Sequence, residues 1–178
     1  MVKIPSPYSE RQELLSTLLN AFIMQQGYPF KELLQARHQT MDPLRELAGV
    51  YNFYQVEDNG DRTSLFVGSA AFEIPTADKS RTWGLHARLS QHFHPSQKNT
   101  IAGRMAKAQG TTPRIIIRDV LCKKKIFLQW FPTFGMHTDG GYLRLKDQKH
   151  ITDHAQMAEE IKWCEYFAIA ILQPLYAT

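Results

Sequence analysis

Residues 49–68 of the chain read Gly49-Val50-Tyr51-Asn52-Phe53-Tyr54-Gln55-Val56-Glu57-Asp58-Asn59-Gly60-Asp61-Arg62-Thr63-Ser64-Leu65-Phe66-Val67-Gly68. The first eight and the last five of these residues are rich in β-branched and aromatic side chains, which favour strands. Between them, Asn59-Gly60 is a pair typical of tight β-turns. The stretch therefore predicts a β-hairpin with strands over residues 50–56 and 64–68.

Helical patterns flank this hairpin on both sides. Upstream, a capping-box sequence at Ser9 precedes apolar residues at helical spacing, and Asp42-Pro43 can begin a short second helix. Downstream, the helix caps and apolar periodicity predict helices over residues 83–93, 96–110 with Ser96 as its cap, and from Thr152 or Asp153 to about 172. The upstream helix is expected over residues 10–25.

The remaining segments complete an α+β pattern. Two more strands are expected over residues 114–121 and 126–131, joined by the turn Lys123-Lys124-Lys125, and residues 133–149 are expected to form a loop. Strands and helices in this order predict a small antiparallel or mixed β-sheet flanked by helices.

The composition is that of one compact domain. The chain has 178 residues, of which 43% are apolar, and this balance excludes disordered and collagen-like classes. The longest strongly apolar run, residues 167–172, is far too short to span a bilayer. The N-terminus lacks the apolar core of a signal peptide, and Cys122 and Cys164 provide no disulfide framework, so a cytoplasmic protein with free thiols is expected.

Positive charge is concentrated in the middle of the chain. The net charge is +4, but residues 81–125 contain ten basic residues against a single acid, Asp119. The rest of the chain is therefore net acidic. Such a concentration favours a phosphate backbone as partner, and the alternative is an ordinary solvated surface.

Four sequence motifs follow one another in an order that resembles the GIY-YIG nuclease family, and within it the small type II restriction endonucleases. They are Gly49-Val50-Tyr51, then Phe66-Val67-Gly68, then Arg88 followed four residues later by His92, then Glu165 with a downstream Pro174-Leu175-Tyr176. The resemblance covers residues 47–178 and implies a nuclease domain there, with residues 1–46 as an N-terminal helical extension. It also implies a three-stranded sheet flanked by helices, one divalent metal ion, Mg²⁺ or Mn²⁺, and phosphodiester hydrolysis.

The resemblance assigns a role to each matched residue. Tyr51 would activate or orient the attacking water, Arg88 would neutralise charge on the phosphoryl oxygens, and His92 would assist at Tyr51 or at the phosphate. Glu165 would hold the metal ion. The residues themselves are compatible with this, because Arg88 and His92 share one helix face and Glu165 lies beside the predicted buried stripe of its helix.

Two positions depart from the family pattern. Phe66 stands where the family has a second tyrosine, and Ala177 stands where it usually has an asparagine. Both departures remove a hydrogen-bonding group near the phosphate, and the loss of one positioned donor can lower a rate by about 100- to 1000-fold. The chain is therefore expected to be either an active enzyme or a catalytically impaired nucleic-acid-binding protein on the same scaffold.

The sequence therefore predicts a metal-dependent DNA endonuclease. More specifically, it suggests a restriction endonuclease that cuts double-stranded DNA as a homodimer. The basic residues expected to contact DNA are Lys98, Arg104, Lys107, Arg114, Lys123, Lys124 and Lys125. Structural alternatives remain for the site: Tyr51 as a plain strand aromatic, and Glu165 paired with an internal arginine. A weaker third hypothesis is a zinc-stabilised interaction domain, because the spacings His92-x-His94 and His150-x-x-x-His154 suit a transition metal.

Overall fold

The computed structural model describes residues 6–73 and 84–176, and within them the fold is α+β, as predicted. The helices are α1 (Ser6–Met24), α2 (Phe30–Met41), α3 (Leu85–Gln91), α4 (Ile101–Gln109), α5 (Pro113–Ile116) and α6 (His154–Leu172), with a 3-10 turn η1 (Asp42–Leu44) and a π turn η2 (Ile117–Leu121). The strands are β1 (Tyr28–Pro29), β2 (Leu47–Val56), β3 (Arg62–Ala70), β4 (Ile126–Met136), β5 (Tyr142–Arg144) and β6 (Lys149–Ile151).

The strands form one antiparallel sheet with the order β3-β2-β4-β5-β6, and β1 pairs with the beginning of β4. The predicted hairpin is confirmed as β2 and β3, and its turn residue Gly60 has φ +89°, a left-handed conformation that favours glycine. The described residues form six strands where the family resemblance implied three. The three long strands are β2, β3 and β4, and the additional ones are short.

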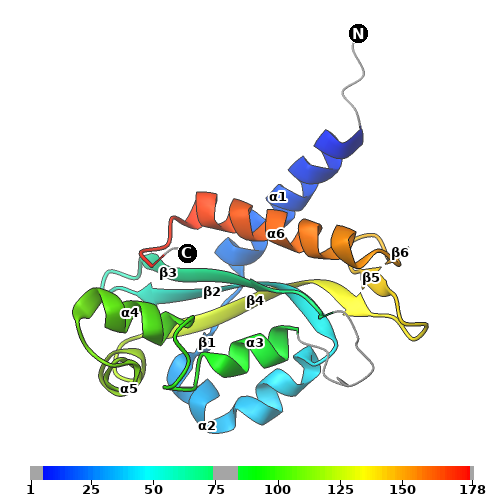
Figure 1. Ribbon diagram of the computed structural model, residues 1–178. Helices are drawn as coiled ribbons and strands as arrows, with labels where there is room; N and C mark the ends of the chain where they lie inside the picture. The colour runs from blue at the N-terminus through cyan, green and yellow to red at the C-terminus, as the bar shows by residue number, and fades with distance from the viewer. Residues whose placement is uncertain (1–5, 74–83, 177–178) are drawn as a thin grey trace.

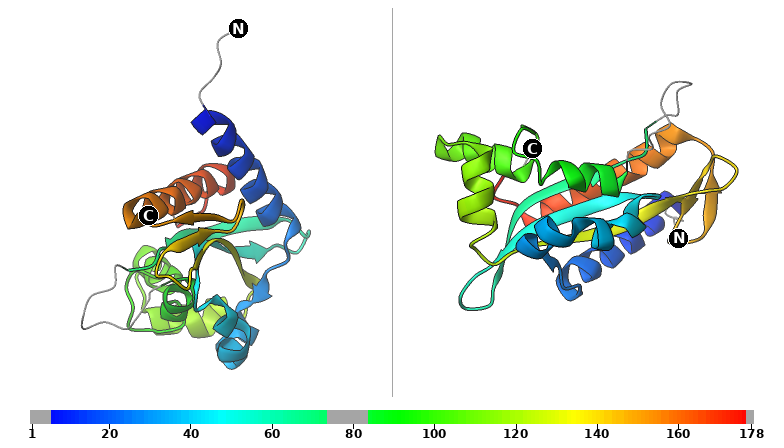
Figure 2. Two further views of the ribbon diagram at one scale, coloured as in Figure 1. Left: turned by 90° about the vertical axis from the view of Figure 1, so that its right-hand side faces the viewer. Right: turned by 90° about the horizontal axis from the view of Figure 1, so that it is seen from below.

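Helices cover both faces of the sheet (Figures 1 and 2). On one face, α1 and α6 pack against Val50 and Val67. On the other, α2, α3 and α4 enclose Tyr51, Phe53 and Phe66. Strand β2 is consequently buried on both sides, which explains why its sequence is apolar almost throughout rather than alternating.

Two predicted segments are wrong. Residues 114–121 are helical rather than a strand, because Thr112 caps α5 and Pro113 occupies its first turn. Of the isoleucine run, Ile116 is buried and Ile115 is exposed, as on a helix surface. Residues 133–149, expected as a loop, contain the end of β4 and both β5 and β6. Two glycines of this segment lie in a turn, at Gly140, and in a close contact with β6, at Gly141, and not in an irregular loop.

Other helix boundaries differ in detail. Helix α4 begins after Thr100, whose side chain accepts a hydrogen bond from Gly103 N, and not at Ser96. Asp153 caps α6, which was one of the two expected positions. Helix α2 was not expected from the sequence at all, and it contributes the buried Phe30 and Leu33 to the core.

The segment after α6 covers the outer edge of the sheet. Leu175 N and Tyr176 N donate to Ser64 O and Leu65 O at 3.1 and 2.9 Å, so the backbone of β3 is partly satisfied on its exposed side. Both cysteines are free thiols. Within residues 6–73 and 84–176, no helix combines the length and the apolar character needed to cross a membrane.

Candidate active site

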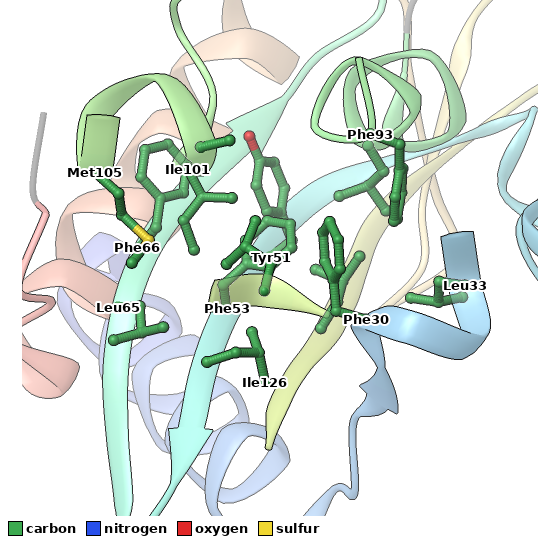
Figure 3. Packing of buried hydrophobic residues seen from close by; sticks show 14 of the residues in the cluster. Phe30, Leu33, Tyr51, Phe53, Leu65, Phe66, Phe93, Ile101, Met105 and Ile126 are labelled. Atoms are coloured by element: carbon green, nitrogen blue, oxygen red, sulfur yellow. The ribbon is translucent and has the colours of Figure 1, made fainter. Parts of the chain in front are cut away.

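Two glycines make room for the Tyr51 ring and its strand. Tyr51 lies opposite Gly68 across β2 and β3, and a Cβ at Gly68 would stand 2.4 Å from Tyr51 Oη. A Cβ at Gly49 would stand 2.2 Å from the Phe131 carbonyl oxygen, where the β2–β4 register shifts. The ring is fully buried among residues of β2, β3, α2 and α4 (Figure 3). The two glycine positions of the motif are therefore fixed by steric contact.

Helix α3 directs two side chains at the Tyr51 hydroxyl. Arg88 Nε donates to Tyr51 Oη at 3.2 Å, and His92 Nε2 lies 2.9 Å from the same oxygen. Arg88 is in the last turn of α3 and His92 is its C-cap, so the four-residue spacing places both on one face, as expected.

The hydrogen bonds of His92 define its tautomer. The backbone N–H of Ile101, the first residue of α4, donates to His92 Nδ1 at 3.1 Å, so this nitrogen is an acceptor. Complete burial, together with the charge of Arg88, lowers the pKa of His92 well below its ordinary value of 6.5. The imidazole is therefore neutral and carries its proton on Nε2, from which it donates to Tyr51 Oη.

Tyr51 is a neutral phenol at physiological pH. Burial raises its pKa to about 12, although the charge and the hydrogen bond of Arg88 act in the opposite direction. Its oxygen accepts hydrogen bonds from both Arg88 and His92, which leaves its own proton for a third partner. The group is arranged to donate a hydrogen bond and not to act as a phenolate.

The Arg88 guanidinium is held on all sides. Its Nη1 donates to Gln91 Oε1 at 2.7 Å and its Nη2 donates to the Asn99 carbonyl oxygen at 3.0 Å. The first contact is to a side chain of α3 itself and the second is to the backbone of the segment before α4, so both segments orient the guanidinium. A planar guanidinium held in this way can bind two oxygens of one phosphate once it exchanges partners.

Glu165 is a buried carboxylate on the other face of the sheet. It is 3% exposed, accepts a hydrogen bond from Ser69 Oγ at 2.9 Å, and forms an ion pair with Lys162. Its negative charge contributes to raising the pKa of Tyr51, but among the described contacts none joins Glu165 to Tyr51, Arg88 or His92. The structure therefore brings three of the four predicted site residues together, and Glu165 lies apart from them. The structural alternative, in which Glu165 pairs with a cation, agrees with this contact except in the residue type: the partner is Lys162, three residues earlier on α6, and not an arginine.

The donors around Glu165 fit a hard divalent cation. A carboxylate and the Ser69 hydroxyl offer oxygen ligands only, and Mg²⁺ or Mn²⁺ binds through one or two carboxylates, water and substrate phosphate. The Lys162 ammonium shows that this buried carboxylate already requires a positive partner. A metal ion here would replace that ammonium.

Arg104 belongs to this site, which the sequence did not reveal. It was expected on a DNA-binding surface, but its guanidinium lies over the Phe66 ring, 5.6 Å from the centroid, and its charge lowers the pKa of Tyr51. Its position three residues after the buried Ile101 was the available signal, because residues at that spacing share a helix face. Phe66 is buried and stacks on Tyr51, with ring centroids 6.2 Å apart.

The other basic residues expected to contact DNA are exposed on the segment before α4, on α4 and α5, and on the turn before β4. These are Lys98, Lys107, Arg114, Lys123, Lys124 and Lys125. Helices α4 and α5 lie side by side at one end of the sheet (Figure 1). Lys123 pairs with Asp119 and Lys125 with Asp58, at 2.8 and 3.6 Å. Arg81, at the beginning of the basic window, and Ala177 lie outside the described residues.

The two histidine pairs singled out by spacing do not form ligand sets. His92 is bonded to Tyr51 and to the Ile101 amide, whereas His94 is exposed. His154 Nε2 lies 2.7 Å from the Phe72 carbonyl oxygen. Zinc held by either pair therefore has no support in these contacts. His150 lies instead beside His137 and Asp139 of the turn after β4.

No family model matches the chain, and neither a curated protein nor a solved structure is significantly similar to it. The candidate site therefore rests on the contacts of Arg88 and His92 with the Tyr51 hydroxyl, with Arg104 over the neighbouring Phe66 ring and Glu165 on the other face of the sheet.

Proposed function

We propose that this chain is a metal-dependent DNA endonuclease of the GIY-YIG type, which hydrolyses phosphodiester bonds. One observation carries the proposal: a guanidinium and an imidazole, four residues apart on α3, both bind the hydroxyl of Tyr51. A buried phenol needs one hydrogen-bond partner in any case, but here both contacts are N–H donors to its oxygen, so its own proton stays free to bind a further group.

In this proposal, Tyr51 orients the attacking water. With both N–H donors on its oxygen, the phenol keeps its own proton free to donate to a water. Because the Tyr51 side chain is fully buried, the residues that cover it must part when DNA binds for that water to lie in line with a phosphate. His92 fixes the phenol through Nε2–H and does not remove a proton, because its other nitrogen is occupied by the Ile101 amide. Arg88 exchanges Gln91 and Asn99 for phosphoryl oxygens and stabilises their developing charge.

Glu165 is the proposed metal ligand. A bound Mg²⁺ or Mn²⁺ supplies Lewis-acid stabilisation of the phosphoryl oxygens and the leaving oxygen. Glu165 and Ser69 would hold the ion, and Lys162 would move aside. Arg104, next to Tyr51, adds a second positive charge for the phosphate.

The exposed basic residues of α4, α5 and the turn before β4 form the proposed DNA-binding surface. Double-stranded DNA is the proposed substrate. Since a duplex cut on both strands needs two sites, a homodimer acting on a twofold-symmetric target is the form expected of a restriction enzyme.

The test is cleavage of plasmid and of linear duplex DNA in Mg²⁺ or Mn²⁺. Glu165→Gln and Arg88→Ala should each lower the cleavage rate by about 100-fold or more. Glu159→Gln is the matched control, because Glu159 is an exposed carboxylate on the same helix. Cleavage that survives Glu165→Gln, or that falls equally in Glu159→Gln, contradicts the proposed site.

A second candidate function is DNA binding without cleavage. Two observations favour it: the Tyr51 side chain is completely buried, and Lys162 already neutralises Glu165. Salt-sensitive binding to duplex DNA, with no product in either metal and over all protein concentrations, would select this alternative.

A further inference from the structure

Three potential metal ligands meet at the opposite edge of the sheet from β3, where β5 and β6 lie (Figure 1). His137 and Asp139 lie in the turn that follows β4, and His150 lies in β6. His137 Nδ1 is 2.6 Å and His150 Nε2 is 3.1 Å from the same oxygen, Oδ1 of Asp139. The two imidazole ring centroids are 4.6 Å apart.

The backbone of the turn builds this cluster. Gly140 has φ +89° and closes the turn, in which His137 N donates to Gly141 O and Gly140 N donates to His137 O. A Cβ at Gly141 would lie 2.2 Å from His150 Nε2, so the absence of a side chain there admits the imidazole. Gly141 N also donates to Asp139 Oδ1 at 3.2 Å and orients the carboxylate.

The chemistry of the cluster is that of a cation site. Two imidazole nitrogens face one carboxylate oxygen, and the two rings lie beside each other. Each of the three groups offers a lone pair to an ion placed between them, so one divalent ion can bind all three. Two imidazoles with one carboxylate favour zinc and its transition-metal neighbours over magnesium.

The spacing of the ligand atoms suits such an ion. In a tetrahedral zinc site with bonds near 2.0–2.1 Å, ligand atoms stand about 3.3 Å apart. The candidate ligand atoms of the three residues all lie within 4.8 Å of one another, so rotations of exposed side chains suffice to reach the geometry. Among the residues that the structure describes, no other three histidine, cysteine or acidic side chains approach as closely.

We propose that His137, Asp139 and His150 bind one zinc-class transition-metal ion, with water completing the coordination, and that the ion ties the β4–β5 turn to β6. The side chains are 37%, 53% and 38% exposed, so the ion has direct access from solvent. The site is separate from Glu165 in its position and in its nitrogen ligands, and it is independent of the proposed nuclease activity.

The experiment is calorimetric titration of the metal-free protein with Zn²⁺ at pH 7.5, in the presence of excess Mg²⁺. Wild type should bind one Zn²⁺ per chain, and His150→Ala and Asp139→Asn should each weaken that binding by about tenfold or more. His94→Ala is the matched control, since His94 is an exposed histidine away from the cluster. Substitution of Co²⁺ should give the visible absorption bands of a low-coordinate site.

Thermal melts with and without a chelator separate loss of metal binding from loss of folding. Without metal, His150→Ala and Asp139→Asn should melt at the wild-type temperature. Zn²⁺ should raise the melting temperature of wild type but not of these two variants. The proposal is overturned if Zn²⁺ binds without one-to-one saturation, or if His94→Ala weakens binding as much as the cluster variants. It is equally overturned if the cluster variants retain wild-type affinity.

Discussion

At the scale of single residues, Tyr51 and His92 form a buried pair whose protonation is set by its surroundings. Burial disfavours the charged form of each group, and the Ile101 amide assigns the imidazole proton to Nε2. Both side chains therefore stay uncharged, and the hydrogen bond between them runs from His92 Nε2 to Tyr51 Oη. The neutrality of His92 has a measurable consequence for stability.

We expect His92 to make the folded protein less stable as the pH is lowered. Its pKa is lowered in the folded protein, so between that value and 6.5 the unfolded chain binds more protons than the folded one. The free energy of unfolding should therefore fall as the pH drops below 6.5, by up to about 1.4 kcal/mol per pH unit. Urea unfolding of wild type and His92→Gln between pH 5 and 7.5 measures this. Parallel pH profiles for the two proteins would contradict the assignment.

Gly68→Ala should destabilise the protein through Tyr51. The new methyl group would stand 2.4 Å from Tyr51 Oη, and overpacking of this kind costs about 1–3 kcal/mol. Gly135→Ala is the matched control, since a Cβ in that strand meets no atom closer than 3.6 Å and should change the unfolding free energy by less than about 1 kcal/mol. Chemical denaturation compares the two. Equal effects would show that the Gly68–Tyr51 contact is not the cause.

At the scale of elements, the connection between α3 and α4 holds the site together. The Arg88 guanidinium donates to the Asn99 carbonyl, and the first amide of α4 donates to His92. Thr100, which is fully buried, caps α4 between these two contacts. The N-terminus of α4 therefore positions two residues of α3 that lie on a different helix.

Thr100→Ala should lower the free energy of unfolding by about 1 kcal/mol, because it removes the hydroxyl that accepts from Gly103 N. If the cap also positions Arg88 and His92, the variant should lose cleavage activity beyond its loss of stability. Thr100→Ser keeps the hydroxyl and should retain most of both properties. Identical behaviour of the two variants would mean that the hydroxyl does not act as a cap.

At the scale of the whole molecule, the two proposed binding regions lie at opposite ends of the sheet. The exposed cations on α4, α5 and the following turn gather at one end, whereas the His137–Asp139–His150 cluster occupies the other (Figure 1). A polyanion should therefore approach from the α4 and α5 end, beside the Tyr51 site.

Lys107→Gln should weaken binding to duplex DNA and reduce the slope of log affinity against log salt by about 0.9, the value for one phosphate contact. Lys149→Gln, an exposed lysine on β6, should change neither. Fluorescence anisotropy at several salt concentrations measures both slopes. If Lys149→Gln has the larger effect, the proposed DNA-binding surface is wrong.

The local features of this protein were predictable from its sequence. The β2–β3 hairpin, the cap at Asp153 and the shared face of Arg88 and His92 all depend on interactions within a few residues. The strand predicted over 114–121 was wrong because the prediction followed the β-branched residues of this stretch. The helix start at Thr112-Pro113 was the better local signal.

The contacts between distant residues were decided by the tertiary structure alone. Sheet register places Tyr51 opposite Gly68, and packing of α3 brings His92, 41 residues away, to the Tyr51 hydroxyl. The approach of His150 to Asp139 likewise depends on how β6 pairs with β5. Turn chemistry and helix periodicity act over short stretches of chain. The contacts between distant residues form because one apolar surface is buried against another, and no short segment specifies that packing.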